Sequence, residues 1–160
     1  MQHYHQRMLL IKQYNESREL NNRMYNHQQH RPCHLALLLV VLELSLRELA
    51  QKHKKLWAFN GQIGDYSTLF AEIDQNDLVS LDVYNDTAWR HAMHLHGHHF
   101  WVMSDDPTMA LPTGQRDTWL MQPRERISLV FKADNPGLWL FHCHMLEHAA
   151  SGMGAVLAID

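Results

Sequence analysis

The chain has 160 residues, 46% of them hydrophobic, which is enough for one domain with a buried core. Its formal net charge is −3 at pH 7 with histidine neutral, and no basic cluster occurs, so we expect no nucleic-acid partner. Two cysteines, Cys33 and Cys143, exclude a framework of several disulfides and a zinc site made of four cysteines.

The first 55 residues differ from the rest of the chain. Residues 1–34 are rich in Gln, Asn, His and charge, so we expect a polar tail that is disordered or helical. Residues 35–55 read as an apolar run and a short helix, since Ser45 and Glu48 form a capping-box pattern. The run is much shorter than the roughly 20 residues of a membrane-spanning helix. No small-residue cleavage site follows it, so no clear signal peptide is predicted.

From residue 56 the hydrophobic pattern changes to the period of two that is typical of β-strands. Apolar and polar residues alternate over 79–84 and 127–132. Turn signals such as Asn60-Gly61 and the segment 134–137 separate the expected strands. We therefore predict that residues 56–160 form one all-β domain, a sandwich or barrel.

The chain contains 14 histidines, and two short segments, 91–102 and 141–153, hold the most informative ones. In the first segment, His94 and His96 are two residues apart, so on a strand both would point to one face. His91 precedes His94 by three residues and can turn another way. The first segment therefore predicts ligands on two faces of one strand.

The second segment repeats this spacing around a thiol. His142 and His144 flank Cys143, so one strand would join a thiolate site on one face to an imidazole site on the other. Thiolate, imidazole and thioether together are typical of copper, and a blue-copper centre needs two histidines, one cysteine and a weak axial ligand. The residues that fit this set are His91, Cys143, His148 and Met153. A second imidazole cluster would contain His94, His96, His142 and His144.

At this point a family resemblance is plain. Residues from about 57 to 160 resemble the C-terminal cupredoxin domain of bacterial, laccase-like multicopper oxidases. The matching segments are WAFNG, NDTAWRHAMHLHGHHFWV, RDTWL, ADNPGLWLFHCHMLEH and GM. The resemblance implies a Greek-key cupredoxin barrel or sandwich with a non-homologous N-terminal segment. It implies type 1 copper at His91, Cys143, His148 and Met153, type 2 copper at His94, and a type 3 pair at His96, His142 and His144.

The resemblance also implies an activity. A reducing substrate, either a phenol, an aromatic amine or a metal ion, would give single electrons to type 1 copper at His91, Cys143 and His148. The trinuclear cluster would receive these electrons and reduce O2 to water. A periplasmic or extracellular location is expected on the same ground.

Two departures from the family leave alternatives open. The family completes its trinuclear cluster with two more H-x-H pairs from an N-terminal cupredoxin domain, whereas outside the two histidine segments the only H-x-H here is His3–His5. Ala149 stands where many bacterial relatives carry an acidic residue. We therefore expect a C-terminal piece that needs a further domain or subunit and lacks full oxidase activity alone. A stand-alone single-copper carrier or an inactive fragment is the alternative. A copper nitrite reductase fits less well, because that family pairs a histidine with only one side of the cysteine.

Overall fold

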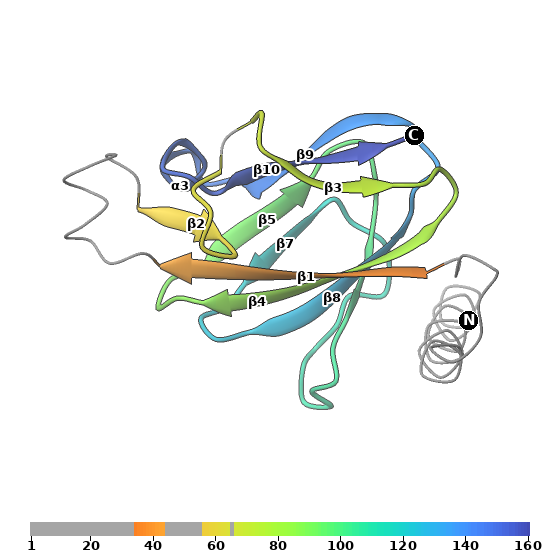
Figure 1. Cartoon of the computed structure of the whole chain (residues 1–160). Coiled ribbons are helices and arrows are strands. Elements are labelled where there is room, and N and C mark those ends of the chain that lie inside the picture. Colours follow the sequence, from red (N-terminus) through yellow and green to blue (C-terminus); the bar gives the residue numbers. More distant parts are fainter. Residues whose placement is uncertain (1–33, 44–55, 65) are drawn as a thin grey trace, which may run out of the picture.

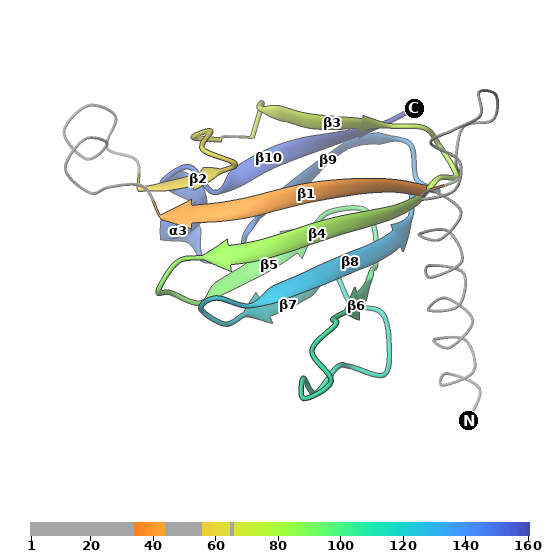
Figure 2. The ribbon, with the colours of Figure 1, turned by 60° about the horizontal axis from the view of Figure 1, so that its bottom comes forward.

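The computed structural model describes residues 34–43, 56–64 and 66–160. Two five-stranded sheets pack face to face, and one short helix lies at one end of the sandwich (Figures 1 and 2). The all-β prediction is confirmed. Most of the predicted polar tail and the predicted helix after Ser45 lie outside the described residues.

The first sheet has the strand order β2-β1-β4-β8-β6. Its strands are β1 (His34–Glu43), β2 (Trp57–Phe59), β4 (Leu78–Asp86), β6 (Trp101–Met103) and β8 (Arg126–Lys132). β1 lies between β2 and β4, antiparallel to the first and parallel to the second. The sequence prediction began the domain at residue 56 and placed the apolar run of 35–55 before it. The structure instead places residues 34–43 inside the sheet, between β2 and β4.

The second sheet has the strand order β3-β10-β9-β5-β7. Its strands are β3 (Leu69–Ile73), β5 (His91–Leu95), β7 (Thr118–Met121), β9 (Gly137–Cys143) and β10 (Gly154–Ile159), and α3 (Leu146–Ala150) joins β9 to β10. β5 and β9 are antiparallel neighbours, with Met93 opposite Cys143 and His94 opposite His142. The two histidine segments, which are about 50 residues apart in the chain, therefore meet in adjacent strands.

The core fills the space between the two sheets. The alternation predicted over 79–84 and 127–132 is confirmed, because Val79, Leu81 and Val83 of β4 are all fully buried. The inward side chains of β5, β8, β9 and β10 complete one continuous cluster. Burial of each such aliphatic or aromatic side chain stabilises the fold by about 1.5–3 kcal/mol. The copper-ligand candidates of β5 and β9 therefore sit on strands that the core holds in place.

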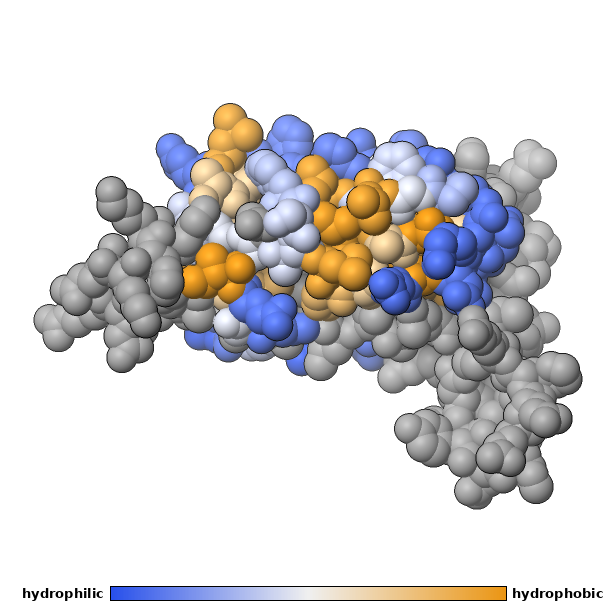
Figure 3. All heavy atoms as spheres, turned by 45° about the horizontal axis from the view of Figure 1, so that its top comes forward, coloured by the Kyte–Doolittle hydropathy of each residue, from blue (hydrophilic) through white to orange (hydrophobic). Residues whose placement is uncertain are grey.

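The outer face of the second sheet carries exposed apolar side chains. Leu120 lies opposite Ala92 and Leu138 lies opposite Ala158, both on the face that points away from the core, and they are 46% and 74% exposed. Leu69 at the start of β3 is 50% exposed. Figure 3 shows hydrophobic side chains gathered on the side of the molecule where β3 lies.

Candidate metal centre

Three predicted ligands converge where β5, β9 and α3 meet. His91 begins β5, Cys143 ends β9 and His148 lies on α3. The Nδ1 atoms of the two histidines are 3.1 Å apart. The Cys143 sulfur lies 3.9 Å from Nδ1 of His91 and 3.6 Å from Nδ1 of His148. The three donor atoms therefore surround a common point.

The spacing of these atoms fits a single metal ion. With metal–nitrogen bonds of about 2.0 Å and a metal–sulfur bond of about 2.3 Å, a trigonal site separates its donor atoms by about 3.5–3.8 Å. The observed separations of 3.1, 3.6 and 3.9 Å lie around these values. Two imidazoles with one thiolate are the donor set of blue copper, so the chemistry and the geometry agree.

Burial prepares these groups for a metal. His91 and Cys143 are both 0% exposed. Burial, with a smaller contribution from neighbouring His148, lowers the pKa of His91 to about 4, so the ring is neutral at pH 7. Burial also lowers the pKa of His148 and raises the pKa of the Cys143 thiol. A cation at this point would compensate the buried thiolate, so metal binding and loss of the thiol proton would occur together.

Two more buried side chains belong to this centre. Met153 is fully buried, and its carbonyl oxygen accepts a hydrogen bond of 3.1 Å from the Cys143 N–H, so it lies beside the cysteine. This is the neighbourhood expected of an axial ligand. The Trp57 ring packs against both histidines, with ring centroids 4.9 Å from His91 and 4.7 Å from His148. Nothing in the sequence around Trp57 points to a contact with the predicted metal ligands.

The second predicted cluster forms on the outer face of the second sheet. The Nε2 atoms of His96 and His142 are 3.0 Å apart, and the His94 ring lies 4.8 Å from the His96 ring. Nδ1 of His142 donates to the Cys143 carbonyl at 2.9 Å, and Nδ1 of His94 donates to the Asp117 carbonyl at 2.9 Å. Because carbonyls only accept, Nδ1 carries a proton in both rings, and Nε2 is the nitrogen that each ring could offer to a metal.

His144 sits at the margin of this cluster. Its ring is exposed and lies 5.3 Å from the His94 ring and 6.0 Å from the His142 ring. Only His94, His96 and His142 bring their donor atoms within 4.8 Å of one another. The structure thus places all four histidines on the face opposite the Cys143 side chain, as the strand period predicts. That they bind metal stays a prediction.

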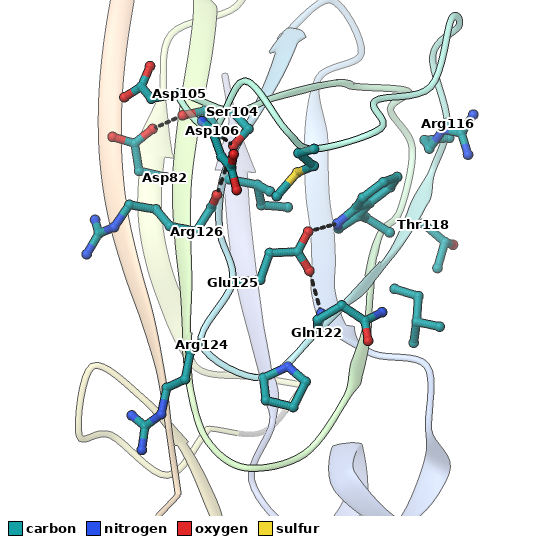
Figure 4. Close-up of a pocket in the computed structure, with 16 residues that line it drawn as sticks. Asp82, Ser104, Asp105, Asp106, Arg116, Thr118, Gln122, Arg124, Glu125 and Arg126 are labelled. Atoms are coloured by element: carbon teal, nitrogen blue, oxygen red, sulfur yellow. Dashed lines mark hydrogen bonds between the residues drawn. The ribbon is translucent and has the colours of Figure 1, made fainter.

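A groove of about 1030 Å³ lies along β7, β8 and the loop after β6 (Figure 4). The Glu125 carboxylate reaches across it, accepting from the Trp119 indole at 3.1 Å and from the backbone N–H of Gln122. None of the eight predicted ligands lines the groove. Its acidic side chains on the loop after β6, Asp105 and Asp106, are exposed.

With the fold and both clusters in place, comparison with known proteins decides the family. Residues 41–160 match the family model described as multicopper oxidase. The chain belongs to the multicopper oxidase family. Copper is the cofactor of this family, and the His91–Cys143–His148 group fits its type 1 site. No helix within the described segments is long and apolar enough to cross a membrane.

The curated relatives are oxidases of fungi and bacteria. The iron multicopper oxidase fer1 of Mycosarcoma maydis is 39% identical over 98 residues, which cover 52% of this chain and 16% of the relative. The iron transport multicopper oxidase FET3 of Saccharomyces cerevisiae is 31% identical, covering 64% and 19%. The multicopper oxidase MmcO of Mycobacterium tuberculosis is 36% identical, covering 63% and 19%. The matched regions thus span less than a fifth of these relatives.

The solved structures support the same fold. The McoA multicopper oxidase of Aquifex aeolicus superposes with a TM-score of 0.68 at 21% identity, over 84% of this chain and 31% of that one. Fet3p, described as a multicopper oxidase that functions in iron import, gives a TM-score of 0.55 at 24% identity, over 86% and 32%. At this identity the likeness shows the cupredoxin fold alone.

Proposed function

We propose that this chain is the domain of a multicopper oxidase that accepts single electrons at type 1 copper and passes them to a trinuclear cluster. The observation that carries the proposal is the convergence of two imidazole nitrogens and one thiol sulfur within 3.9 Å of one another. In the proposal Met153 completes the type 1 ligand set. Copper bound in both clusters would supply one-electron chemistry and, in the complete enzyme, reduction of O2 to water.

His148 is the proposed entry point for electrons. His91 is 0% exposed, whereas His148 is half-buried on the short helix α3. A reducing substrate can therefore approach the His148 edge, whereas the core covers His91.

The route between the clusters runs through Cys143. Its side chain points into the first site, and its carbonyl accepts the hydrogen bond from Nδ1 of His142 in the second. His142 is also the next residue along the backbone, so a covalent path and a hydrogen-bonded path both join the sites. The proposed role of Cys143 is to hold the metal and to begin this route.

The substrate is proposed as a phenol, an aromatic amine or a metal ion. The relatives named for iron favour the metal ion within that set. We further propose that the second cluster needs ligands from another cupredoxin domain or subunit, and that the location is periplasmic or extracellular. A stand-alone one-copper electron carrier is the competing function, and copper stoichiometry separates the two.

The test of the type 1 site uses the copper-loaded chain and its visible spectrum. We expect an intense blue absorption that disappears on reduction by one electron. Cys143→Ser should abolish the blue band, because the colour of such sites comes from the copper–thiolate bond. The matched control is Cys33→Ser, which removes the only other cysteine and should leave the band intact. A blue band that survives Cys143→Ser would refute the proposed ligand set.

A further inference from the structure

A chain of two buried polar side chains leads to His91: Thr87 contacts the ring, and Asn85 contacts Thr87. Oγ1 of Thr87 lies 2.9 Å from Nε2 of His91, while Nδ1 of the same ring faces the Cys143 sulfur. Asn85, Thr87 and His91 are 0%, 1% and 0% exposed. At this burial the three side chains must satisfy their hydrogen bonds with protein partners.

The orientation of the Asn85 amide is fixed by two carbonyls. Its Nδ2 donates to the carbonyl of Trp89 at 2.7 Å and to the carbonyl of Gln122 at 2.8 Å. Carbonyl oxygens only accept, so a flipped amide would place acceptor against acceptor at both contacts. Oδ1 of Asn85 therefore faces Thr87, where it can act only as an acceptor.

This orientation decides what the Thr87 hydroxyl does. A hydroxyl has one proton to donate and two lone pairs. Its proton goes to Oδ1 of Asn85 at 2.7 Å, and the Trp89 carbonyl at 3.1 Å is a second acceptor. The Trp89 N–H donates to Oγ1 at 3.0 Å. One lone pair remains, and Nε2 of His91 faces it, so the proton between them belongs to the imidazole.

We propose that Thr87, oriented by Asn85, is a positioning residue that fixes the Nε2–H tautomer of His91 and so reserves Nδ1 of His91 for the metal. The proposal rests on the proposed role of His91 as a copper ligand. Hydrogen-bond partners of this kind orient a ligand and set its tautomer in many metal sites.

The second histidine of the site, His148, differs from His91. It is half-buried on α3, whereas His91 is fully buried, and its Nδ1 lies 3.1 Å from Nδ1 of His91. The proposal therefore assigns a fixed tautomer to His91 alone. The two imidazoles of the site are therefore not equivalent.

The direct test is the ring protonation of His91 in the unmodified, copper-free chain. Two-bond 1H–15N correlation spectra report which ring nitrogen carries the proton, and the spectrum of His91→Gln assigns the signal. We expect a proton on Nε2 and none on Nδ1. A His91 ring protonated on Nδ1 would overturn the proposal. The measurement needs no copper, so an Nε2–H ring in a chain that never turns blue would uphold the positioning role and refute the copper role instead.

The second test compares Thr87→Val with Thr87→Ser in the same chain. Valine keeps the shape but loses the acceptor, so copper affinity should fall about 10- to 100-fold and the Nδ1–H tautomer should appear. Serine keeps the hydroxyl and should restore both the affinity and the tautomer. A folded Thr87→Val chain with unchanged tautomer and affinity would contradict the proposal. If Thr87→Val does not fold, as thermal unfolding would show, the unmodified chain and Thr87→Ser decide the matter.

Discussion

The two clusters use opposite ring nitrogens of their histidines. His91 and His148 present Nδ1 to the Cys143 sulfur. In the second cluster, the Nδ1 atoms of His94 and His142 are held by backbone carbonyls, so these rings present Nε2. A ligand that binds through Nδ1 brings its backbone closer to the metal than one that binds through Nε2. The first site is accordingly enclosed by strands and core, while the second reaches outward from the face of the sheet.

At the scale of a single residue, Met153 offers a direct test of the axial position. Met153→Leu is a volume-conserving change, so it should cost less than about 1.5 kcal/mol of stability. The loss of the thioether should leave the blue band in place but raise the reduction potential, because a donor that stabilises the oxidised ion has gone. Redox titration of the copper-loaded chain measures this. Met109→Leu, in the loop between β6 and β7, is the control, and equal potentials in both variants would place Met153 outside the site.

Much of the site was predictable from single residues. The spacing of two residues in His94/His96 and in His142/His144 fixes the face of a strand to which each side chain points. The structure places these side chains on one face of the sheet, as this spacing predicts. The partners that set tautomers were not predictable. Thr87 contacts His91, and Asn85, which contacts Thr87, also donates to the Gln122 carbonyl of the β7–β8 connection. The Asp117 carbonyl is a backbone atom, so its contact with His94 cannot be predicted from the residue type at that position.

At the scale of elements, the short helix α3 could not be predicted from the sequence pattern. It has only the five residues Leu146–Ala150 and no side-chain cap at Met145. Five residues are too few for a helical period to emerge. The strands of 79–84 and 127–132 were predictable, since each buries one face over several residues. β1 was not predictable as a strand of the sheet, because an apolar run without alternation does not distinguish a strand from a helix.

β2 and the turn after α3 are hydrogen-bonded to each other and pack closely at Gly152. The backbone N–H groups of Leu56 and Trp57 both donate to the Ser151 carbonyl at 3.0 Å. Gly152 has a φ of +114°, and a Cβ there would overlap the Trp57 carbonyl oxygen and lie 2.9 Å from Cγ2 of Ile63. No side chain fits without separating β2 from the turn that carries Met153.

Gly152→Ala should therefore destabilise the fold by about 1–3 kcal/mol, through backbone strain and the clash with β2. Copper affinity should fall with it, because the residue next to Met153 is displaced. Urea unfolding and copper titration measure the two effects. Gly114→Ala is the matched control: a Cβ at Gly114 meets nothing within 4 Å, so its stability should change by no more than about 0.5 kcal/mol. Equal stability in the two variants would show that the clash is relieved without cost.

On the scale of the whole molecule, the sandwich has one buried and one open group of predicted metal ligands. The first lies inside the fold, with His91, Cys143 and Met153 all fully buried. The second lies on the outer face of the second sheet, which also carries exposed Leu120 and Leu138. Apolar surface next to unpaired metal ligands is what an interface with another domain would cover.

The copper content of the isolated chain tests this division. His94, His96, His142 and His144 are half of the histidines that the family uses for its trinuclear cluster, and their face is open. Each ion placed there would lack ligands, whereas the buried site offers a full set. We therefore expect one copper to survive dialysis per chain and any further copper to be lost. Oxygen uptake with a one-electron reductant should be small, although the blue copper should reduce and reoxidise reversibly.

A matched pair of variants assigns the weak copper to the open face. His96→Ala should reduce only the weakly bound copper, because the His96 ring contacts His94 and His142 but not the buried site. His99→Ala, exposed and outside the cluster, should change neither class. Atomic absorption after dialysis, the blue band and an oxygen electrode give the three readings. Three or more tightly bound coppers per chain, with sustained reduction of O2 to water, would show that the open face closes without another domain and would overturn this division of the molecule.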